Sequence, residues 1–526
     1  MILLLINRLF HSFNHFYMIF KLRSIFIGAF IFCSLLVNAQ KKPNILIIVS
    51  DDHAYQAIGA YGSKLMATPN IDRIAKEGVL FKKAYVTNSI CGPSRAVILT
   101  GKYSHKNGFY DNGNLQFDGS QNTFIKELRL GGYQTAWIGK WHLGSAPQGF
   151  DYWQVLPGQG NYYNPNFLMM DGSSKRVEGY VSNLIEDFSE QWLDTRDTSK
   201  PFCLVIGHKA THRSWFPDTA DMGKFESVNF PFPHNFFDPY NTRAAAKAQD
   251  MTIDKTMVIG SDLKMLGKNR NTDETVKRMN AAQREKFDAY YNPIEAEFNA
   301  KKLSGKSLVE WKYQRYMKDY LSTAASLDRN IGRALNYLDK YHLTENTLVI
   351  YLSDQGFYLG EHGWFDKRFM YEESFRTPML MRFPGVIKPG TQSNDFVMNL
   401  DIASTVLDAA GIKSPNDMQG ESILPVLRQK EIKGRKAMYY HYYENGTHSV
   451  SPHFGIKTSR YKLIRFYEKI EGWELFDLQN DPNELDNIFG KKGFEKITLD
   501  LTNQLKSLIK KYEDVEAEVI LSKGIN

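Results

Sequence analysis

The sequence predicts an α/β fold built on a mostly parallel sheet. Four short runs have the continuous hydrophobicity of strands that are buried on both faces, and they lie at residues 44–50, 133–138, 201–207 and 347–352. Helical patterns alternate with them, at residues 68–78, 122–130 and 308–341. Each of the four strands leads directly into ionisable side chains. Sites of α/β enzymes lie at the carboxyl ends of parallel strands, so we expect an active site at that edge.

Length and composition limit the class of protein. The chain has 526 residues, of which 43% are hydrophobic and 23% charged, so it can bury a large core and form more than one globular unit. The formal net charge is +7, and no dense tract of Lys and Arg occurs. This charge favours a small anionic ligand, such as a sulfate or phosphate ester, and we expect no nucleic-acid partner.

The N-terminus has the features of an export signal. Lys21 and Arg23 precede an apolar run at residues 24–37, and the small Ala39 follows it, which predicts a signal peptide over residues 1–39. We therefore expect an exported protein, periplasmic or secreted, with no stable membrane span after cleavage. An uncleaved anchor is the alternative, although the run is short for one. Removal of the signal leaves Cys91 and Cys203, so no disulfide framework is expected.

Cys91 lies at the start of a predicted helix. Pro93 suits the first helical turn, and Arg95 follows about one turn after the cysteine. A cysteine at a helix N-terminus beside a cation is well placed for chemistry. The alternative is an inert buried cysteine at an ordinary helix start.

Oxygen-bearing side chains follow two of the predicted strands. Asp51 and Asp52 come after the first strand, and Asp354 and Gln355 come after the strand at 347–352. Such a donor set suits a hard cation such as Ca²⁺ better than zinc. Taken singly, each pair could also be an ordinary solvated turn.

The cysteine segment resembles the maturation motif of type I sulfatases. The shared residues are Cys91, Pro93, Ser94 and Arg95, followed by Leu99, Thr100 and Gly101. In that family the cysteine is oxidised to formylglycine. The resemblance continues at residues 139–144 (Gly-Lys-Trp-His-Leu-Gly), 354–356, 359–363 and 473–478.

This family resemblance implies a particular architecture. We expect an alkaline-phosphatase-like sandwich, with a large mixed, mostly parallel sheet between helices. A smaller C-terminal α+β subdomain with an antiparallel sheet would follow. The predicted boundaries are 40–430 for the catalytic domain and 431–526 for the subdomain, with an insertion at about 214–306 that either covers the open side of the site or is a solvated excursion.

The resemblance also implies roles for single residues. The metal ligands would be Asp51, Asp52, Asp354, Gln355 and Cys91 as formylglycine, and the cofactor Ca²⁺. Lys140 and Lys367 would bind the sulfate, and Arg95 would steady the aldehyde hydrate. His212 would protonate the leaving alcohol and His142 would accept the proton of the second hydroxyl. Two positions depart from the family pattern, because Gln355 replaces an asparagine and Thr211 replaces a proline.

The substrate prediction rests on a similarity to one subgroup. Residues 149–165 resemble sulfatases that act on 6-O-sulfated N-acetylglucosamine in glycosaminoglycan or mucin glycans. His441 and His453, with Tyr442 and His448, fall where the C-terminal domain of the family approaches the mouth of the site, so one of them is expected to contact the sugar.

Two other functions stay open at this point. A phosphonate or phosphodiester hydrolase would share the fold and the matured cysteine. A glycan-binding protein would hold a sulfated sugar without cleaving it, if the expected partner, a sulfatase-maturating enzyme, never converts Cys91.

Overall fold

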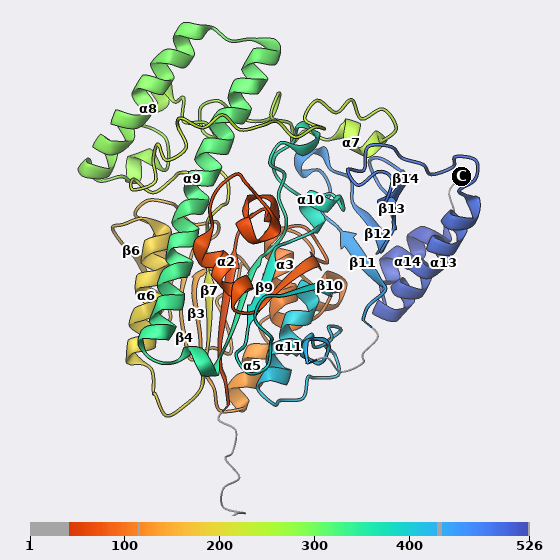
Figure 1. Ribbon diagram of the computed structural model, residues 1–526, viewed down its shortest axis with the longest axis horizontal. Coiled ribbons are helices and arrows are strands. Elements are labelled where there is room, and N and C mark those ends of the chain that lie inside the picture. The colour runs from red at the N-terminus through yellow and green to blue at the C-terminus, as the bar shows by residue number, and fades with distance from the viewer. Residues whose placement is uncertain (1–41, 114–115, 429–433, 524–526) are drawn as a thin grey trace, which may run out of the picture. The chain divides into compact units, whose positions relative to one another are not determined.

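A ten-stranded sheet forms the centre of the protein (Figure 1). The computed structural model describes residues 42–113, 116–428 and 434–523, so the predicted signal peptide lies outside the described residues. The strand order is β10-β2-β9-β8-β1-β7-β3-β4-β5-β6. The strands are β1 Asn44–Ser50, β2 Val79–Tyr85, β3 Gln134–Lys140, β4 Tyr152–Leu156, β5 Asn166–Met169, β6 Ser174–Arg176, β7 Phe202–Gly207, β8 Thr347–Ser353, β9 Met379–Arg382 and β10 Thr391–Met398.

The four strands predicted from apolar runs form the parallel middle of this sheet. β1 pairs in parallel with β7 and β8, and β3 pairs in parallel with β7 and β4. β9 and the outer strands β5 and β6 run antiparallel to their neighbours. The predicted mixed, mostly parallel sheet is therefore confirmed.

Helices cover both faces of the sheet, as the sandwich prediction requires. Ile47 of β1 packs in one layer with α3 and α5, whereas Ile48 packs in the other with α2, α6 and α9, because successive strand side chains point to opposite faces. The helices are α2 Pro69–Lys76, α3 Cys91–Thr100, α4 Ser104–Asn107, α5 Phe124–Leu130, α6 Val181–Thr195, α7 Ala244–Ala248, α8 Ala281–Lys301, α9 Gly305–Lys340, α10 Glu372–Phe375, α11 Ile402–Ala409, α12 Leu424–Leu427, α13 Glu495–Tyr512 and α14 Val515–Ser522.

A second, four-stranded antiparallel sheet follows in the C-terminal region. Its strands are β11 Ala437–Tyr442, β12 His453–Thr458, β13 Tyr461–Phe466 and β14 Gly472–Asp477. Leu501 and Leu505 of α13 are buried in the same apolar cluster as residues of this sheet. The predicted C-terminal sheet is thus confirmed. Both sheets belong to one compact unit that starts at Pro43, and the domain boundary at 430/431 stays a prediction.

The predicted insertion contains long irregular stretches before its main helix. From the end of β7 to α8, the only α-helix in the described chain is the short α7. The backbone of the insertion contacts two loops of the rest of the protein. Asp250 N–H donates to His448 O, and Ile253 N–H donates to Gly363 O, each at 2.9 Å. Among the described residues, every helix is too short or too polar to cross a membrane.

Candidate active site

Three carboxylates meet where β1 and β8 end. The two strands are in register, with Ser50 beside Ser353, so the residues that follow them become neighbours. Oxygen atoms of Asp51, Asp52 and Asp354 lie within 4.8 Å of one another, and all three side chains are buried. Three buried carboxylates this close repel one another and need positive charge nearby.

Each carboxylate has one basic partner. Lys140, the last residue of β3, donates to Asp51. Lys367 donates to both oxygens of Asp52 at 2.8 Å.

Arg95 of α3 supplies the third partner. Its Nε donates to Asp354 Oδ2 at 2.9 Å, and its Nη1 donates to the backbone oxygen of Lys140 at 2.8 Å. The structure therefore brings the three predicted basic residues together with the three predicted aspartates.

The cluster also contains oxygen atoms that nothing in the described chain satisfies. Asp51 Oδ1 and Gln355 Oε1 are buried and lack a hydrogen-bond partner among the described residues. The Gln355 amide nitrogen donates to Asp52 Oδ1, which leaves its oxygen free for another ligand. Burial raises the pKa of Asp52 to about 7 even though Lys367 lowers it, and burial with repulsion from Asp51 raises the pKa of Asp354. A site made of oxygen atoms, two of them unsatisfied, fits a divalent cation such as Ca²⁺.

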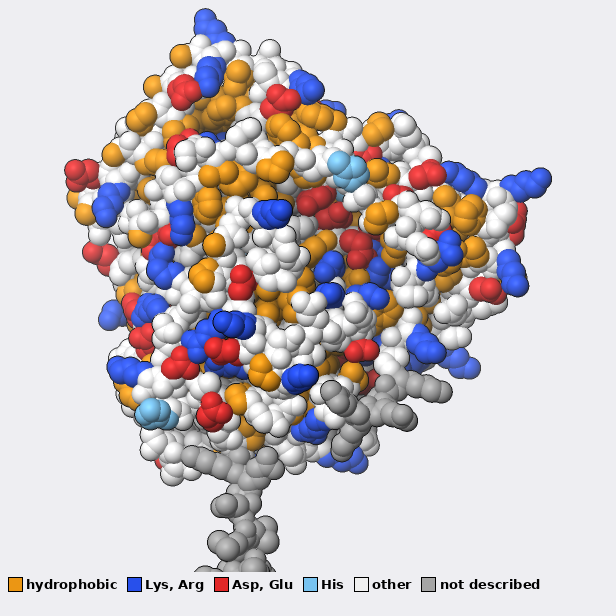
Figure 2. All heavy atoms as spheres, in the orientation of Figure 1, with side chains coloured by type: hydrophobic (Ala, Val, Ile, Leu, Met, Phe, Trp, Pro, Cys, Tyr) orange, Lys and Arg blue, Asp and Glu red, His pale blue; other side chains and the backbone are white. Residues whose placement is uncertain are grey.

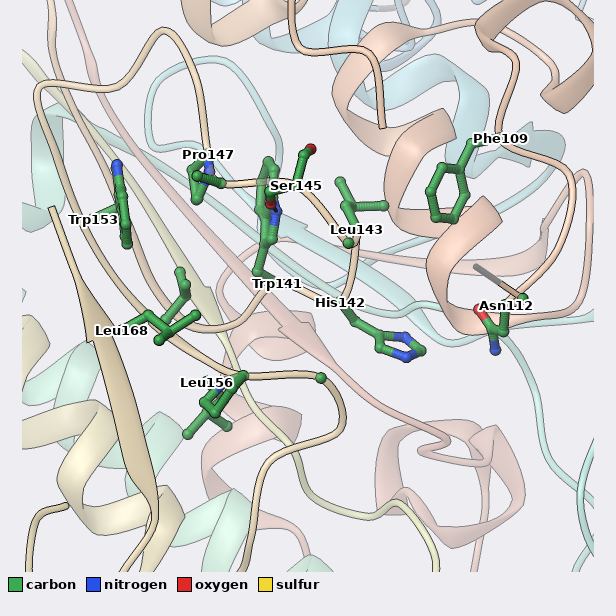
Figure 3. A pocket seen from close by; sticks show the side chains of 16 residues that line it. Phe109, Asn112, Trp141, His142, Leu143, Ser145, Pro147, Trp153, Leu156 and Leu168 are labelled. Atoms are coloured by element: carbon green, nitrogen blue, oxygen red, sulfur yellow. Dashed lines mark hydrogen bonds between the residues drawn. The ribbon is translucent and has the colours of Figure 1, made fainter. Parts of the chain in front are cut away.

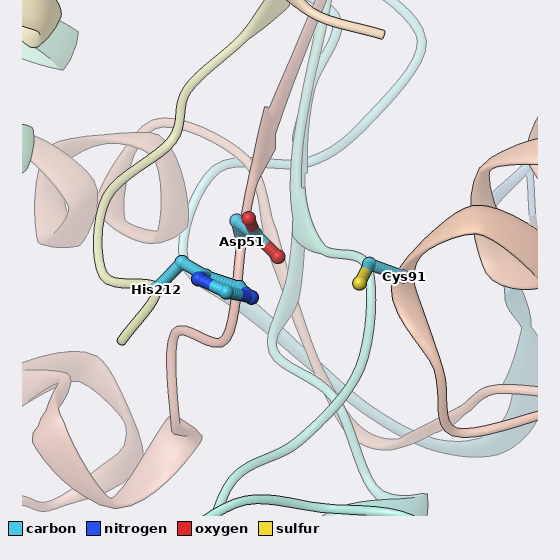
Figure 4. A group of neighbouring side chains, drawn as sticks. All are labelled: Asp51, Cys91 and His212. Atoms are coloured by element: carbon cyan, nitrogen blue, oxygen red, sulfur yellow. The ribbon is translucent and has the colours of Figure 1, made fainter. Parts of the chain in front are cut away.

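Cys91 lies beside this cluster. Its sulfur, an Asp51 oxygen and a His212 ring nitrogen lie within 4.8 Å of one another (Figure 4). Burial raises the pKa of the Cys91 thiol, but the charges of Lys367 and Lys140 outweigh this effect, and its pKa falls below the usual value.

Asn112 holds the cysteine in place. Its amide nitrogen donates to Cys91 Sγ at 3.3 Å, and its amide oxygen accepts from Gly92 N–H at 3.0 Å. The sequence analysis missed this residue. The Asp-Asn-Gly sequence at 111–113 indicates a turn but not this contact.

His212 is neutral in the substrate-free site, because burial holds its pKa well below the usual range. Its Nδ1 lies 2.7 Å from the backbone oxygen of Arg213, which can only accept, so Nδ1 carries the proton. The bare Nε2 faces the cluster, 3.9 Å from Asp52 Oδ2.

His142 is also neutral. It has a left-handed backbone conformation with a φ of 58°. Burial, followed by the charge of Lys140, lowers its pKa to about 2. Its Nδ1 is buried without a partner among the described residues.

An apolar cavity of about 290 Å³ adjoins the site on the side of His142 (Figure 3). Asn112 and His142 line one end, and Trp141, Trp153 and Leu168 are among the apolar side chains that line the rest. The cavity therefore reaches His142 and Asn112, of which Asn112 contacts Cys91.

The structure does not bring His441 and His453 to the site. His441 bonds Asp514 through Nδ1 (2.7 Å) and Tyr467 through Nε2 (2.8 Å). His453 bonds Ser451 O at 2.9 Å and accepts from Met370 N–H at 3.1 Å. All four ring nitrogens are thus used inside the protein, and both side chains are buried.

Polar side chains next to Lys367 form a group that includes His448 and Tyr442, two of the residues expected near the sugar. His448 Nε2 lies 3.0 Å from Asp366 Oδ2, and Arg368 bonds Tyr442 at 3.0 Å and also Glu444. Acidic, basic and histidine side chains are interspersed near the centre of the face drawn in Figure 2. Only the closeness of Asp366 and Arg368 to Lys367 in sequence could have drawn attention to them.

Comparison with known proteins gives a consistent result. A family model described as "Sulfatase" matches residues 43–412, and one described as "N-sulphoglucosamine sulphohydrolase, C-terminal" matches residues 360–511. An N-acetylglucosamine-6-O-sulfatase of Bacteroides thetaiotaomicron is 48% identical, over 92% of this chain and 90% of its own length. An ulvan-active sulfatase of Formosa agariphila is 27% identical, over 91% of this chain and 82% of its own length.

A solved structure is similarly close. It is described as a complex with its substrate, D-glucosamine-2-N,6-O-disulfate, and it is 48% identical to this chain. The TM-score is 0.88, and the match covers 90% of this chain and 99% of that one.

Proposed function

This chain belongs to the sulfatase family, and we propose that it hydrolyses the 6-O-sulfate ester of N-acetylglucosamine in glycosaminoglycan or mucin glycans. It is a sulfuric ester hydrolase. The proposal rests above all on the position of Cys91, whose sulfur is buried within 4.8 Å of Asp51 and His212. The similarity to a relative named for this sugar supports the substrate.

Two groups complete the proposed site. Bound Ca²⁺ would withdraw charge from the ester, and formylglycine, formed from Cys91 by a sulfatase-maturating enzyme, would supply a hydroxyl nucleophile as its hydrate. Asp51, Asp52, Asp354 and Gln355 would hold the cation, which is consistent with the two unsatisfied oxygens among them.

Lys140 and Lys367 bind the sulfate oxygens. Each ammonium already contacts an aspartate and has three hydrogens to donate, so a sulfate oxygen can be bound without loss of that contact. Fixed positive charges in a buried site stabilise the charge that develops on the sulfuryl oxygens. Arg95 keeps Asp354 in position from the side of α3.

His212 and His142 act as the proton donor and the proton acceptor of the reaction. His212 must gain a proton on Nε2 before it can donate to the departing sugar oxygen, and the negative charge of an incoming sulfate ester favours that protonation. His142 lines the same cavity as Asn112, and its buried Nδ1 has no partner among the described residues, so it can accept a proton.

The polar side chains beside Lys367 bind the sugar. Asp366, Arg368 and His448 combine a carboxylate, a guanidinium and an imidazole, which suits the hydroxyl groups of a sugar. We extend the proposal to an exported protein, periplasmic or secreted, on the basis of the signal-like residues 1–39.

The decisive experiment compares the two cysteines of the mature chain. Protein produced with a maturation enzyme should carry formylglycine at Cys91, measured by mass spectrometry of its peptide. Cys91→Ala should abolish release of sulfate from 6-O-sulfated N-acetylglucosamine while the melting temperature stays near that of the wild type.

Cys203 on β7 provides the matched control, since it is also buried but belongs to the core. Cys203→Ala should keep its activity. Undiminished hydrolysis by Cys91→Ala would refute the mechanism, and an unmodified Cys91 in active protein would do the same.

A further inference from the structure

A buried lysine that the proposed mechanism does not use lies two residues after β7. Lys209 is 4% exposed, and no ion pair among the described residues includes it. Burial, followed by the charge of Lys140, lowers its pKa to about 7. A buried ammonium without a carboxylate is costly, so stability alone does not explain a lysine here.

Lys209 makes two contacts with one loop. Its Nζ donates to the backbone oxygen of Gln159 at 3.1 Å and lies 4.8 Å from the centre of the Tyr162 ring. A backbone hydrogen bond and a cation–π contact together fix the segment between these residues.

Both contacted residues touch the active site. The Gln159 side-chain oxygen accepts from Lys140 Nζ, whose other hydrogen-bond partner is Asp51. The Tyr162 hydroxyl donates to the backbone oxygen of His212. The Lys209 ammonium therefore contacts Gln159, which bonds Lys140, and also Tyr162, which bonds the backbone of His212.

We propose that Lys209 is a positioning residue that, through Gln159 and Tyr162, fixes the Lys140 ammonium and the His212 ring relative to each other. This role rests on the functions proposed above for Lys140 and His212. Loss of a partner that orients an active-site group typically lowers affinity or activity by about 10-fold to 100-fold.

The test uses variants of similar shape. Lys209→Met and Gln159→Met should each lower kcat/KM for an aryl sulfate by about tenfold or more. Gln159→Asn keeps a neutral amide acceptor for Lys140, although one methylene shorter, so it should retain clearly more activity than Gln159→Met. The combined Lys209→Met/Gln159→Met variant should lose no more than the worse single variant, because Lys209 acts on Lys140 through Gln159.

Binding gives a readout that does not depend on turnover. In a Cys91→Ala background, Lys209→Met should weaken binding of inorganic sulfate in calorimetry by roughly the same factor as in kcat/KM. Lys200→Met is the control, since Lys200 is exposed just before β7, at the opposite end of the same strand. It should change neither measurement.

Several results would overturn the inference. These are wild-type kinetics in Lys209→Met or Gln159→Met, equal losses in Gln159→Asn and Gln159→Met, or additive losses in the combined variant. If Lys209→Met fails to fold, the partly exposed Gln159 still decides the question. Failure to hydrolyse the 6-O-sulfated sugar, with aryl sulfate turnover intact, would refute the proposed substrate and leave these comparisons valid.

Discussion

At the scale of single residues, Gln355 is the departure from the family pattern at the proposed cation site. Its amide nitrogen bonds to Asp52, and its amide oxygen remains unsatisfied. The longer side chain therefore still reaches the cluster through its amide group. Asp354 differs, because it contributes a charge and also pairs with Arg95.

This difference predicts unequal effects on calcium binding. Asp354→Asn should weaken calcium affinity by roughly 100-fold or more, because removal of one charge about 4 Å away is worth several kcal/mol near a protein surface. Gln355→Asn keeps an amide group and leaves the net charge of the site unchanged, so it should weaken calcium affinity far less than Asp354→Asn. Calcium titration of chelator-treated protein, followed by activity, measures both variants.

The same titration tests the identity of the metal. Chelation should abolish activity and Ca²⁺ should restore it, since the donor set contains only oxygen atoms. Recovery with zinc but not calcium would show that the proposed ligand set is wrong. Equal damage in the two variants would assign Gln355 another role.

At the scale of elements, the start of α2 depends on a distant helix. The sequence predicts that Thr68 caps it, but Thr68 makes no such bond, because its hydroxyl donates to Asp72 at 2.9 Å and accepts from Gly59 N–H at 2.8 Å. Asp328 of α9 takes its place, with Oδ1 accepting from Ile71 N–H at 2.9 Å.

Removal of this cap should destabilise the contact between the two helices. Asp328→Ala should lower the free energy of unfolding by about 1–3 kcal/mol, because a buried N–H loses its acceptor. Asp328→Asn keeps a side-chain oxygen and should lose less. Urea unfolding measures both, and equal stability of Asp328→Ala and the wild type would show that α2 needs no cap from α9.

At the scale of the whole molecule, His453 connects the small sheet to the loop that carries Lys367. It lies on β12 of the small sheet and accepts from Met370 N–H, three residues after Lys367. Burial lowers the pKa of His453 to about 3. The ring is thus neutral in the folded protein over the whole physiological range.

The sign of the pH effect follows from this shift. Below about pH 6.5 the unfolded chain binds a proton at His453 that the folded protein does not bind until about pH 3. The protonation of His453 therefore does not lower the free energy of unfolding above pH 6.5. Below that pH it lowers this free energy by about 1.4 kcal/mol per pH unit. From pH 7 to pH 5 the loss from His453 is about 2 kcal/mol.

His453→Gln tests this directly, because glutamine does not titrate. The variant should be less stable at pH 7, but it should lose about 2 kcal/mol less than the wild type between pH 7 and pH 5 in urea unfolding. A parallel loss in both proteins would show that His453 does not titrate as proposed.

The sequence by itself determined the parallel middle of the large sheet and the centre of the site. Apolar runs such as 44–50 and 347–352 are local signals of buried strands, and the polar residues after them are adjacent in sequence. The carboxyl ends of parallel neighbours share an edge, so Asp51 and Asp354 had to meet, although about 300 residues separate them. The cysteine motif carried its own local signature, and the family membership is confirmed.

Only the tertiary structure decided the partners of these residues. Asn112 beside Cys91, Asp328 at the start of α2 and Lys209 behind Lys140 have no local signal, because each acts through a residue far away in sequence. The same reason explains His441 and His453, whose positions in the sequence suggested sugar contacts. Whether a ring nitrogen faces solvent or a buried partner depends on long-range packing, which a pattern of neighbouring residues does not contain.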